Sequence, residues 1–170
     1  VLISKPPSQS VAKRVIDTLA HSEKPCTVCF LGADAPSLPD NVSFARTLKA
    51  AAELATGRSS KNKRPEFKSV IPPVPPGRQR IHGLFCGGTL SSEAQVVFLD
   101  QGVSVASNAP IPGAEAVGSG TSHVLIDLGS DEYTRGRPHP MIDPTVRDEE
   151  LTKALADPTL AVILLDVVIG

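Results

Sequence analysis

The feature that most constrains the fold is a pair of apolar runs near the end of the sequence, His123–Leu128 and Thr159–Ile169. Runs without polar alternation are typical of strands that helices cover on both faces, as in parallel sheets. Between the runs, Arg147–Asp157 has apolar residues at helical spacing, and Pro144 suits the first turn of that helix. This order predicts a strand–helix–strand unit with a right-handed crossover. The loop after the first strand then lies at the edge where open α/β sheets bind ligands.

The loop before the predicted helix, GRPHPMIDP (136–144), carries more charged chemistry than a connection needs. Arg135 and Arg137 can clamp a phosphate or a carboxylate through paired hydrogen bonds. The alternative for both arginines is a surface ion pair with Asp131 or Glu132. Both arginines are therefore candidate phosphate-binding residues.

His139 is the candidate catalytic residue of this loop. Two prolines flank it and fix its backbone, and an imidazole exchanges protons near neutral pH, which suits an acid–base group or a phosphate ligand. The alternative is a loop histidine that is bonded to a backbone carbonyl. Asp127 and Asp143 are expected in structural roles, as a turn residue and a helix cap, with Thr145 as the other candidate cap.

A glycine turn supplies a second candidate part of a site. Ile81–Phe85 predicts a strand, Leu90–Gln101 predicts a helix, and CGGT (86–89) joins them. This arrangement presents free backbone N–H groups and the positive end of a helix to an anion, although the same turn also occurs as a merely tight connection. The predicted phosphate-binding residues in the turn are Gly87, Gly88 and Thr89.

The first part of the chain predicts half of a doubly wound α/β domain. Ser8–Ser22 and Asn41–Thr56 have helical spacing, with Ser8 and Asp40 as their expected N-caps. Apolar runs at 1–4 and 27–31 supply the strands of this β-α-β-α order. Further along, Val103–Ala106 is a candidate short strand, and residues 107–122 are expected to form a long surface loop.

The segment Arg58–Arg80 is rich in proline and basic residues and has no usable periodicity. We interpret it as a solvated linker, and the alternative is a basic patch for phosphates or RNA. The chain is thus divided into residues 1–57, 58–80 and 81–170. It begins VLIS without methionine and stops just after an apolar run, so we expect a piece of a longer protein.

Composition narrows the classes of function. A formal net charge of −1 gives no support to general binding of nucleic acid or of a membrane surface. No apolar run approaches the roughly 20 residues that span a bilayer, and no signal peptide is recognisable, so cytoplasm is the default compartment. Cys26 and Cys29 form a C-x-x-C, but residues three apart on a strand point to opposite faces. We therefore expect buried cysteines and neither a metal site nor a disulfide.

Three stretches, GLFCGGTLSSEA, HVLIDLGSDEYTRGRPHPMIDP and LADPTLAVILLDVVIG, resemble the FdrA-type proteins. These are relatives of the succinyl-CoA synthetase superfamily, the nucleoside-diphosphate-forming acyl-CoA synthetases. The resemblance implies two flavodoxin-like CoA-ligase part-domains, with residues 1–57 similar to the α-subunit and residues 81–170 to the β-subunit. It also implies an acyl-CoA synthetase-like enzyme that handles a phosphate or acyl-phosphate intermediate, with coenzyme A and a nucleotide as cofactors.

The resemblance implies a phosphohistidine relay as well, and the sequence departs from it. The phosphate helix of the β-type matches Gly87–Leu90, but Ala33–Gly57 contains no histidine, and the loop SKPPS contains no carboxylate. The missing histidine leaves a non-catalytic regulatory subunit as one alternative. The resemblance to the FdrA type implies another, a component of an oxamate carbamoyltransferase in ureide breakdown, which converts oxalurate and phosphate to oxamate and carbamoyl phosphate. The expected partners are an acyl or carbamoyl substrate, phosphate, and companion subunits or copies of this chain, without nucleic acid or membrane.

Overall fold

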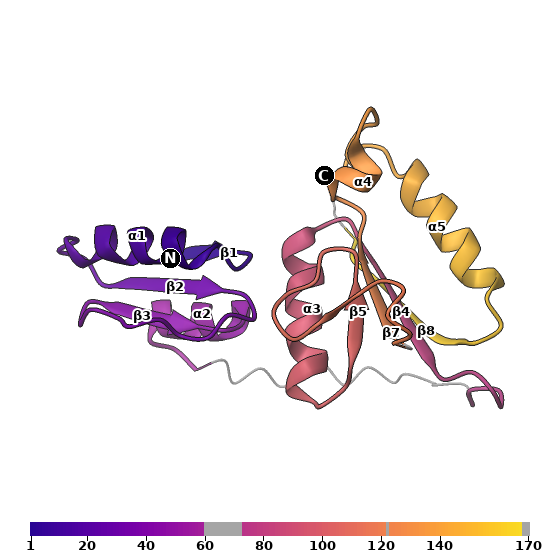
Figure 1. The fold of residues 1–170 in the computed structure, drawn as a ribbon, viewed down its shortest axis with the longest axis horizontal. Coiled ribbons are helices and arrows are strands. Elements are labelled where there is room, and N and C mark those ends of the chain that lie inside the picture. The colour runs from indigo at the N-terminus through magenta and orange to yellow at the C-terminus, as the bar shows by residue number, and fades with distance from the viewer. Residues whose placement is uncertain (60–72, 122, 168–170) are drawn as a thin grey trace.

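A computed structural model describes residues 1–59, 73–121 and 123–167, and it contains two parallel β-sheets with helices packed on them (Figure 1). The first sheet has the order β1-β2-β3 and the second has the order β6-β5-β7-β4-β8. Every strand pair in both sheets is parallel. The predicted α/β class with parallel sheets is therefore confirmed.

Helices cover both faces of the first sheet because its central strand alternates its buried side chains. Val28 and Phe30 pack beneath α1, whereas Cys29 and Leu31 pack on the opposite face with α2. The predicted N-cap Ser8 is confirmed, since its hydroxyl accepts a hydrogen bond from the N–H of Val11 at 3.4 Å. The elements are β1 (Leu2–Ser4), α1 (Gln9–Ala20), β2 (Cys26–Phe30), β3 (Val42–Ala45) and α2 (Leu48–Thr56).

The prediction of one helix over Asn41–Thr56 is wrong in its first part. Residues 42–45 form β3, which pairs with β2 from Cys26↔Val42 to Cys29↔Ala45. The helix begins only at Leu48, and its N-cap is Thr47 instead of Asp40. A strand of four residues is too short to reveal its period in the sequence, and pairing with β2 satisfies backbone groups that a helix would leave exposed on that strand.

The second sheet also has helices on both faces. Leu84 and Ile126 pack in one cluster beneath α5, and Phe85 and Leu125 pack in another on the α3 side. The short helix α4 and the two-residue strand β6 lie in segments that the sequence predicted as loops. The elements are β4 (Arg80–Phe85), α3 (Gly88–Asp100), β5 (Val105–Ser107), β6 (Glu115–Ala116), β7 (His123–Asp127), α4 (Asp131–Thr134), α5 (Thr145–Ala156) and β8 (Leu160–Leu165).

Strands β7 and β8 lie on either side of β4 and run parallel to it, as the predicted crossover requires. Burial on both faces is confirmed for the carboxyl half of β7 but is wrong for β8, where Val162 is 41% and Leu165 is 43% exposed. The reason is position, since β8 is an edge strand of the described sheet. Residues 168 and 169 of the predicted run, and 60–72 of the predicted linker, lie outside the described residues.

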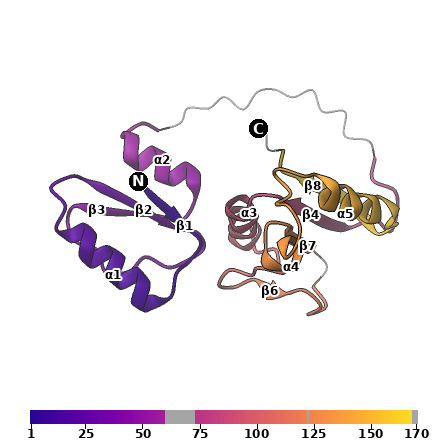
Figure 2. The same cartoon turned by 90° about the horizontal axis from the view of Figure 1, so that it is seen from above.

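The two sheets meet through a small set of contacts. In Figures 1 and 2 the carboxyl end of β2 points toward the second sheet, and α3 is the helix nearest to it. Arg46 lies 3.4 Å from Asp100, and the N–H of Leu48 donates to Glu93 Oε1 at 2.7 Å. None of the helices in the described residues is long and apolar enough to cross a membrane.

Candidate functional site

The candidate site lies where β1 and β7 end, and its centre is an ion pair between the two sheets. Lys5 Nζ lies 2.7 Å from Asp127 Oδ2, and the side chains are 48% and 3% exposed. The other carboxylate oxygen, Oδ1, accepts a hydrogen bond from the N–H of Gly129 at 2.9 Å. Asn108 fixes the backbone of Asp127, because its Oδ1 accepts from the Asp127 N–H at 2.8 Å. A buried carboxylate is costly unless it is paired, so the charge of Asp127 depends on Lys5 from the other sheet.

The glycine turn lies directly beside this ion pair. A Cβ atom on Gly88 would lie 2.5 Å from Asp127 Oδ2 and 2.6 Å from Lys5 Nζ, so the position has no room for a side chain unless the pair separates. Helix α3 begins at Gly88 and has no side-chain cap. The positive end of a helix and the Lys5 ammonium group therefore converge on one place.

The Asp166 side chain binds the first two residues of the same turn, Cys86 and Gly87. Its Oδ1 accepts from the N–H of Cys86 and its Oδ2 from the N–H of Gly87, both at 2.7 Å. The carboxylate is 7% exposed, so these are buried, charge-assisted hydrogen bonds. The Gly87 amide, which the sequence predicts as an anion donor, is thus bonded to a carboxylate of the chain. The amides of Gly88, Thr89 and Leu90 lie at the helix N-terminus before the first intrahelical bond, from Ser91 to Gly87.

His139 lies at the same edge of the sheet. A Cβ atom on Gly129 would lie 2.8 Å from His139 Nε2 and 3.2 Å from Asp127 Oδ1, so both side chains approach the same backbone atom. The N–H of Met141 donates to His139 Nδ1 at 3.2 Å. Because Nδ1 accepts this bond, the neutral ring carries its proton on Nε2, the nitrogen that faces the ion pair.

The predicted arginines have different surroundings. Arg137 Nη1 lies 3.7 Å from Glu149 Oε2 on α5, and the two side chains are 59% and 54% exposed. Arg135 is exposed, and no ion pair found among the described residues includes it. Gly88 and His139 each lie beside Asp127, Gly87 is bonded to Asp166, and Thr89 is exposed on the first turn of α3. Among the described residues, no hydrogen bond or ion pair joins either arginine to the glycine turn. Their role in binding phosphate stays a prediction.

Cys86 is a buried thiol at this site. Burial raises its pKa, and the neighbouring Asp166 carboxylate adds to the rise, which the Arg147 guanidinium offsets only in part. Cys86 is thus held in the protonated form and is a poor nucleophile. Cys26 and Cys29 are free and pack in the clusters on opposite faces of β2, as their spacing predicted. No group of three or more metal-ligating side chains occurs within the residues that the structure describes.

Sequence reasoning missed two residues of the site and assigned a third to another role. The sequence pattern predicts no role for Lys5 in the loop SKPPS, places Asp166 within an apolar strand, and favours a turn role for Asp127. A signal was present: each of the three follows or ends an apolar run. In parallel sheets such positions meet at the ligand-binding edge.

Two comparisons with known proteins bear on this site. The sequence model of the CoA-ligase family matches residues 84–170, which include the glycine turn, Asp127, His139 and Asp166. The uncharacterized protein YahF of Escherichia coli (strain K12) is 37% identical over 182 aligned positions. That alignment covers 99% of this chain and 35% of the relative, so the chain spans about a third of the length of the protein it matches.

Proposed function

The chain belongs to the CoA-ligase family, and from this premise we propose that it is the part of an acyl-CoA synthetase-like enzyme that holds a phosphate or acyl phosphate. The proposed place is the junction of the two sheets, at the N-terminus of α3. The observation that carries the proposal is the position of Lys5, whose ammonium group lies 2.7 Å from Asp127 and beside Gly88. Membership supports an acyl-CoA synthetase-like role in the succinyl-CoA synthetase superfamily. The closer likeness to the FdrA type is part of the proposal.

Two features of the junction attract an oxyanion, the N-terminus of α3 and the Lys5 ammonium group, and they act against the carboxylates of Asp127 and Asp166. The helix N-terminus contributes roughly half a positive charge, and the Lys5 side chain is exposed enough to turn toward a ligand. Asp166 is already bonded to two backbone amides and Asp127 to Gly129, which lowers the repulsion that these carboxylates exert on an anion. In this proposal the amides of Gly88 and Thr89, the Thr89 hydroxyl and Lys5 bind the phosphate oxygens.

His139 is the proposed acid–base residue. Its Nε2 lies beside Gly129 at the junction, so the neutral ring is set to donate a hydrogen bond from Nε2–H to a bound phosphate. Proton transfer to a leaving oxygen requires the ring to be protonated on both nitrogens, and the ring becomes neutral when that proton leaves. The histidine of the family's relay has no counterpart in residues 33–57. The proposal therefore gives His139 a role in proton transfer and does not include a phosphohistidine.

Coenzyme A and a nucleotide are the cofactors that the family implies. One lysine and one helix N-terminus fit a single phosphate group, and they do not fit the several phosphates of a nucleotide triphosphate or of coenzyme A. The junction is thus not assigned to either cofactor. Companion subunits, homo-oligomers and a cytoplasmic location remain expectations from the sequence.

Calorimetric titration of inorganic phosphate tests the site. Lys5→Met removes a charge-assisted bond and is expected to weaken binding by about 1.5–3 kcal/mol. Gly88→Val is expected to abolish binding, since its side chain collides with Asp127 and Lys5. Arg137→Ala tests the arginine expected from the sequence. A loss of phosphate affinity as large as that of Lys5→Met would show that Arg137 binds the phosphate. Wild-type affinity would show that Arg137 only pairs with Glu149. Wild-type affinity in both Lys5→Met and Gly88→Val would contradict the proposal.

A carbamoyltransferase is the second candidate, favoured by the missing relay histidine and by a junction that fits phosphate alone. Full-length protein, assayed with candidate companion subunits, separates the two. Formation of a thioester that requires coenzyme A supports the synthetase, and phosphate-dependent breakdown of oxalurate supports the carbamoyltransferase. Neither activity in any combination would favour a regulatory subunit.

A further inference from the structure

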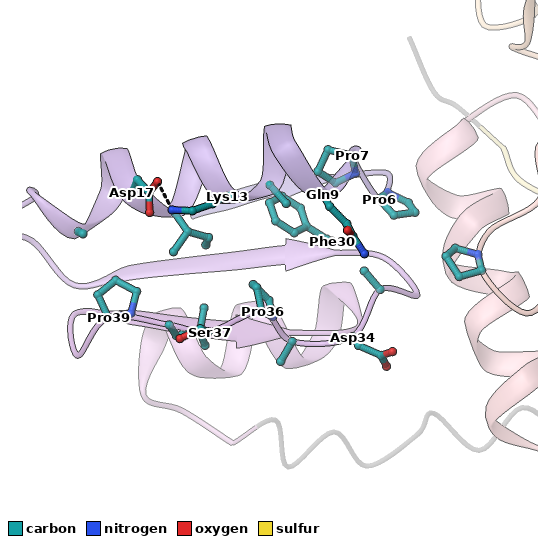
Figure 3. A pocket seen from close by; sticks show the side chains of 17 residues that line it. Pro6, Pro7, Gln9, Lys13, Asp17, Phe30, Asp34, Pro36, Ser37 and Pro39 are labelled. Atoms are coloured by element: carbon teal, nitrogen blue, oxygen red, sulfur yellow. Dashed lines mark hydrogen bonds and ion pairs between the residues drawn. The ribbon is translucent and has the colours of Figure 1, made fainter.

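A cavity of about 890 Å³ lies between α1 and the loop 33–39, apart from the residues of the junction site (Figure 3). Ile16 and Phe30 are buried residues in its lining, and most of the other lining side chains are alanine, proline and leucine. This volume and this apolar character are typical of pockets that enclose the body of a small organic molecule.

The charges around the cavity select against an anionic ligand body. Lys13 is the one cation among the lining residues, and its Nζ already lies 2.7 Å from Asp17 Oδ2. Asp34 adds a further carboxylate to the lining. The Asp34 side chain is fully exposed, and its Oδ1 lies 3.5 Å from Arg46 Nη1, outside the lining. The lining thus offers no cation that is free of a carboxylate, and a carboxylate placed among Ala12, Ile16 and Phe30 would lose its hydration without gaining a partner.

The position of the cavity connects it to the junction. Pro6 and Pro7 line the end nearer the second sheet and follow Lys5 directly in the chain. The loop 33–39 follows Gly32 at the carboxyl end of β2, and Pro112 from the second part of the chain completes the lining. One end of the cavity thus lies near the carboxyl ends of β1 and β2, on the side of the first sheet where Lys5 lies.

We propose that this cavity binds the apolar body of a monocarboxylic substrate, an aliphatic or aromatic acyl group, and that the carboxyl end points toward Lys5. The direction of the carboxyl end rests on the proposed function of the junction, whereas the apolar selectivity rests on the cavity alone. The substrate class is then an apolar monocarboxylic acid. Dicarboxylates such as succinate and polar acids such as oxalurate are expected to bind this cavity more weakly, because a second charged or strongly polar group would lie on the apolar lining.

Titration calorimetry with hexanoate, phenylacetate and succinate tests this selectivity on the full chain. Hexanoate and phenylacetate are expected to bind, with succinate weaker by about tenfold or more, because burial of its second carboxylate has no compensation. Ala12→Phe fills the cavity from α1 and is expected to abolish binding of both apolar acids. Ala52→Phe is the matched control, since it places the same side chain at an exposed position on α2, outside the cavity.

A second variant keeps the test decisive if Ala12→Phe fails to fold. Ala35→Asp adds a charge to an exposed loop position in the lining and is expected to weaken hexanoate binding about tenfold while leaving the core unchanged. Equal affinities in wild type, Ala12→Phe and Ala35→Asp, or succinate binding as tightly as hexanoate, would overturn the inference. Failure of the proposed function gives a different result. In that case phosphate affinity is unchanged in Lys5→Met and Gly88→Val, while the cavity still binds apolar acids in preference to succinate.

Discussion

At the scale of single residues, the two buried aspartates of the junction have different bonding partners. Asp127 faces Lys5 from the other sheet, and Asp166 holds the backbone of the glycine turn through the amides of Cys86 and Gly87. Under the proposed function, a bound phosphate would compete with Asp127 for Lys5. Asp166 would keep its bonds to the glycine turn. The two roles predict different consequences of substitution.

Asp166→Ala is expected to destabilise the fold. It leaves two backbone amides, one of them in the buried residue Cys86, without their acceptor, which costs about 1–3 kcal/mol for each unsatisfied group. Urea unfolding measures the loss. Asp17→Ala is the control, since it removes a carboxylate that is 57% exposed and pairs with Lys13 on the surface of α1, where an ion pair contributes less than about 1 kcal/mol. Equal stability of the two variants would show that Asp166 does not hold the turn.

At the scale of elements, the N-terminus of helix α2 is bonded to two side chains, Thr47 just before the helix and Glu93 of helix α3. The Thr47 hydroxyl accepts from the N–H of Ala50 at 3.2 Å, and Glu93 of α3 accepts from the N–H of Leu48 at 2.7 Å. Two of the amides at the start of the helix thus have side-chain acceptors, and the carboxylate also suits the positive end of the helix. Gly57, at a φ of 63°, ends the helix in the left-handed conformation.

The two candidate caps of α2 differ in their predicted effect on stability. Thr47→Ala is expected to lower the free energy of unfolding by about 1 kcal/mol, as the loss of an N-cap usually does. Asp40→Ala, at the position that sequence pattern favoured, is expected to change it by less than about 0.5 kcal/mol, because Asp40 is exposed and lies before β3. Urea unfolding of the pair decides the matter. A larger loss in Asp40→Ala would mean that the helix begins where the sequence alone placed it.

At the scale of the whole molecule, the hydrophobic cores and the contacts between sheets differ in character. Each of the four clusters of buried apolar residues draws on one sheet only. Polar groups account for several of the contacts that cross from one sheet to the other, such as Lys5 with Asp127 and Arg46 with Asp100. An apolar contact joins them as well, since a Cβ atom on Gly32 would lie 2.6 Å from Ile111 Cδ1. Each sheet with its helices therefore has a core of its own.

Separate cores predict two thermal transitions. Differential scanning calorimetry of the chain is expected to show the two sheets unfolding as distinct steps, because burial of apolar surface dominates stability and each buried cluster draws on one sheet. Added salt is expected to draw the steps further apart, as it screens partly exposed pairs such as Arg46 with Asp100. A single transition whose calorimetric and van't Hoff enthalpies agree would show that the junction couples the two sheets into one cooperative unit.

The sequence by itself determined the features that depend on near neighbours. The alternation of Val28 and Phe30 with Cys29 specifies two buried faces, Ser8 caps α1, and the turn at Gly87 joins a strand to a helix. Short-range sterics and hydrogen bonds decide these features, so the residues that cause them lie within a few positions. The α/β class followed from such local patterns.

Only the tertiary structure decided which distant groups meet. Lys5 and Asp127 are 122 positions apart, and their pairing depends on how the two sheets are arranged. Residues 42–45 form a strand because they pair with the edge of β2. The side chain of Arg137 pairs with Glu149 on α5 and not with the glycine turn. Long-range burial and charge pairing outweigh local preferences of a few tenths of a kcal/mol per residue, roughly the size of helix propensities. For that reason the candidate site contains His139 from the predicted loop and Lys5 from the other sheet.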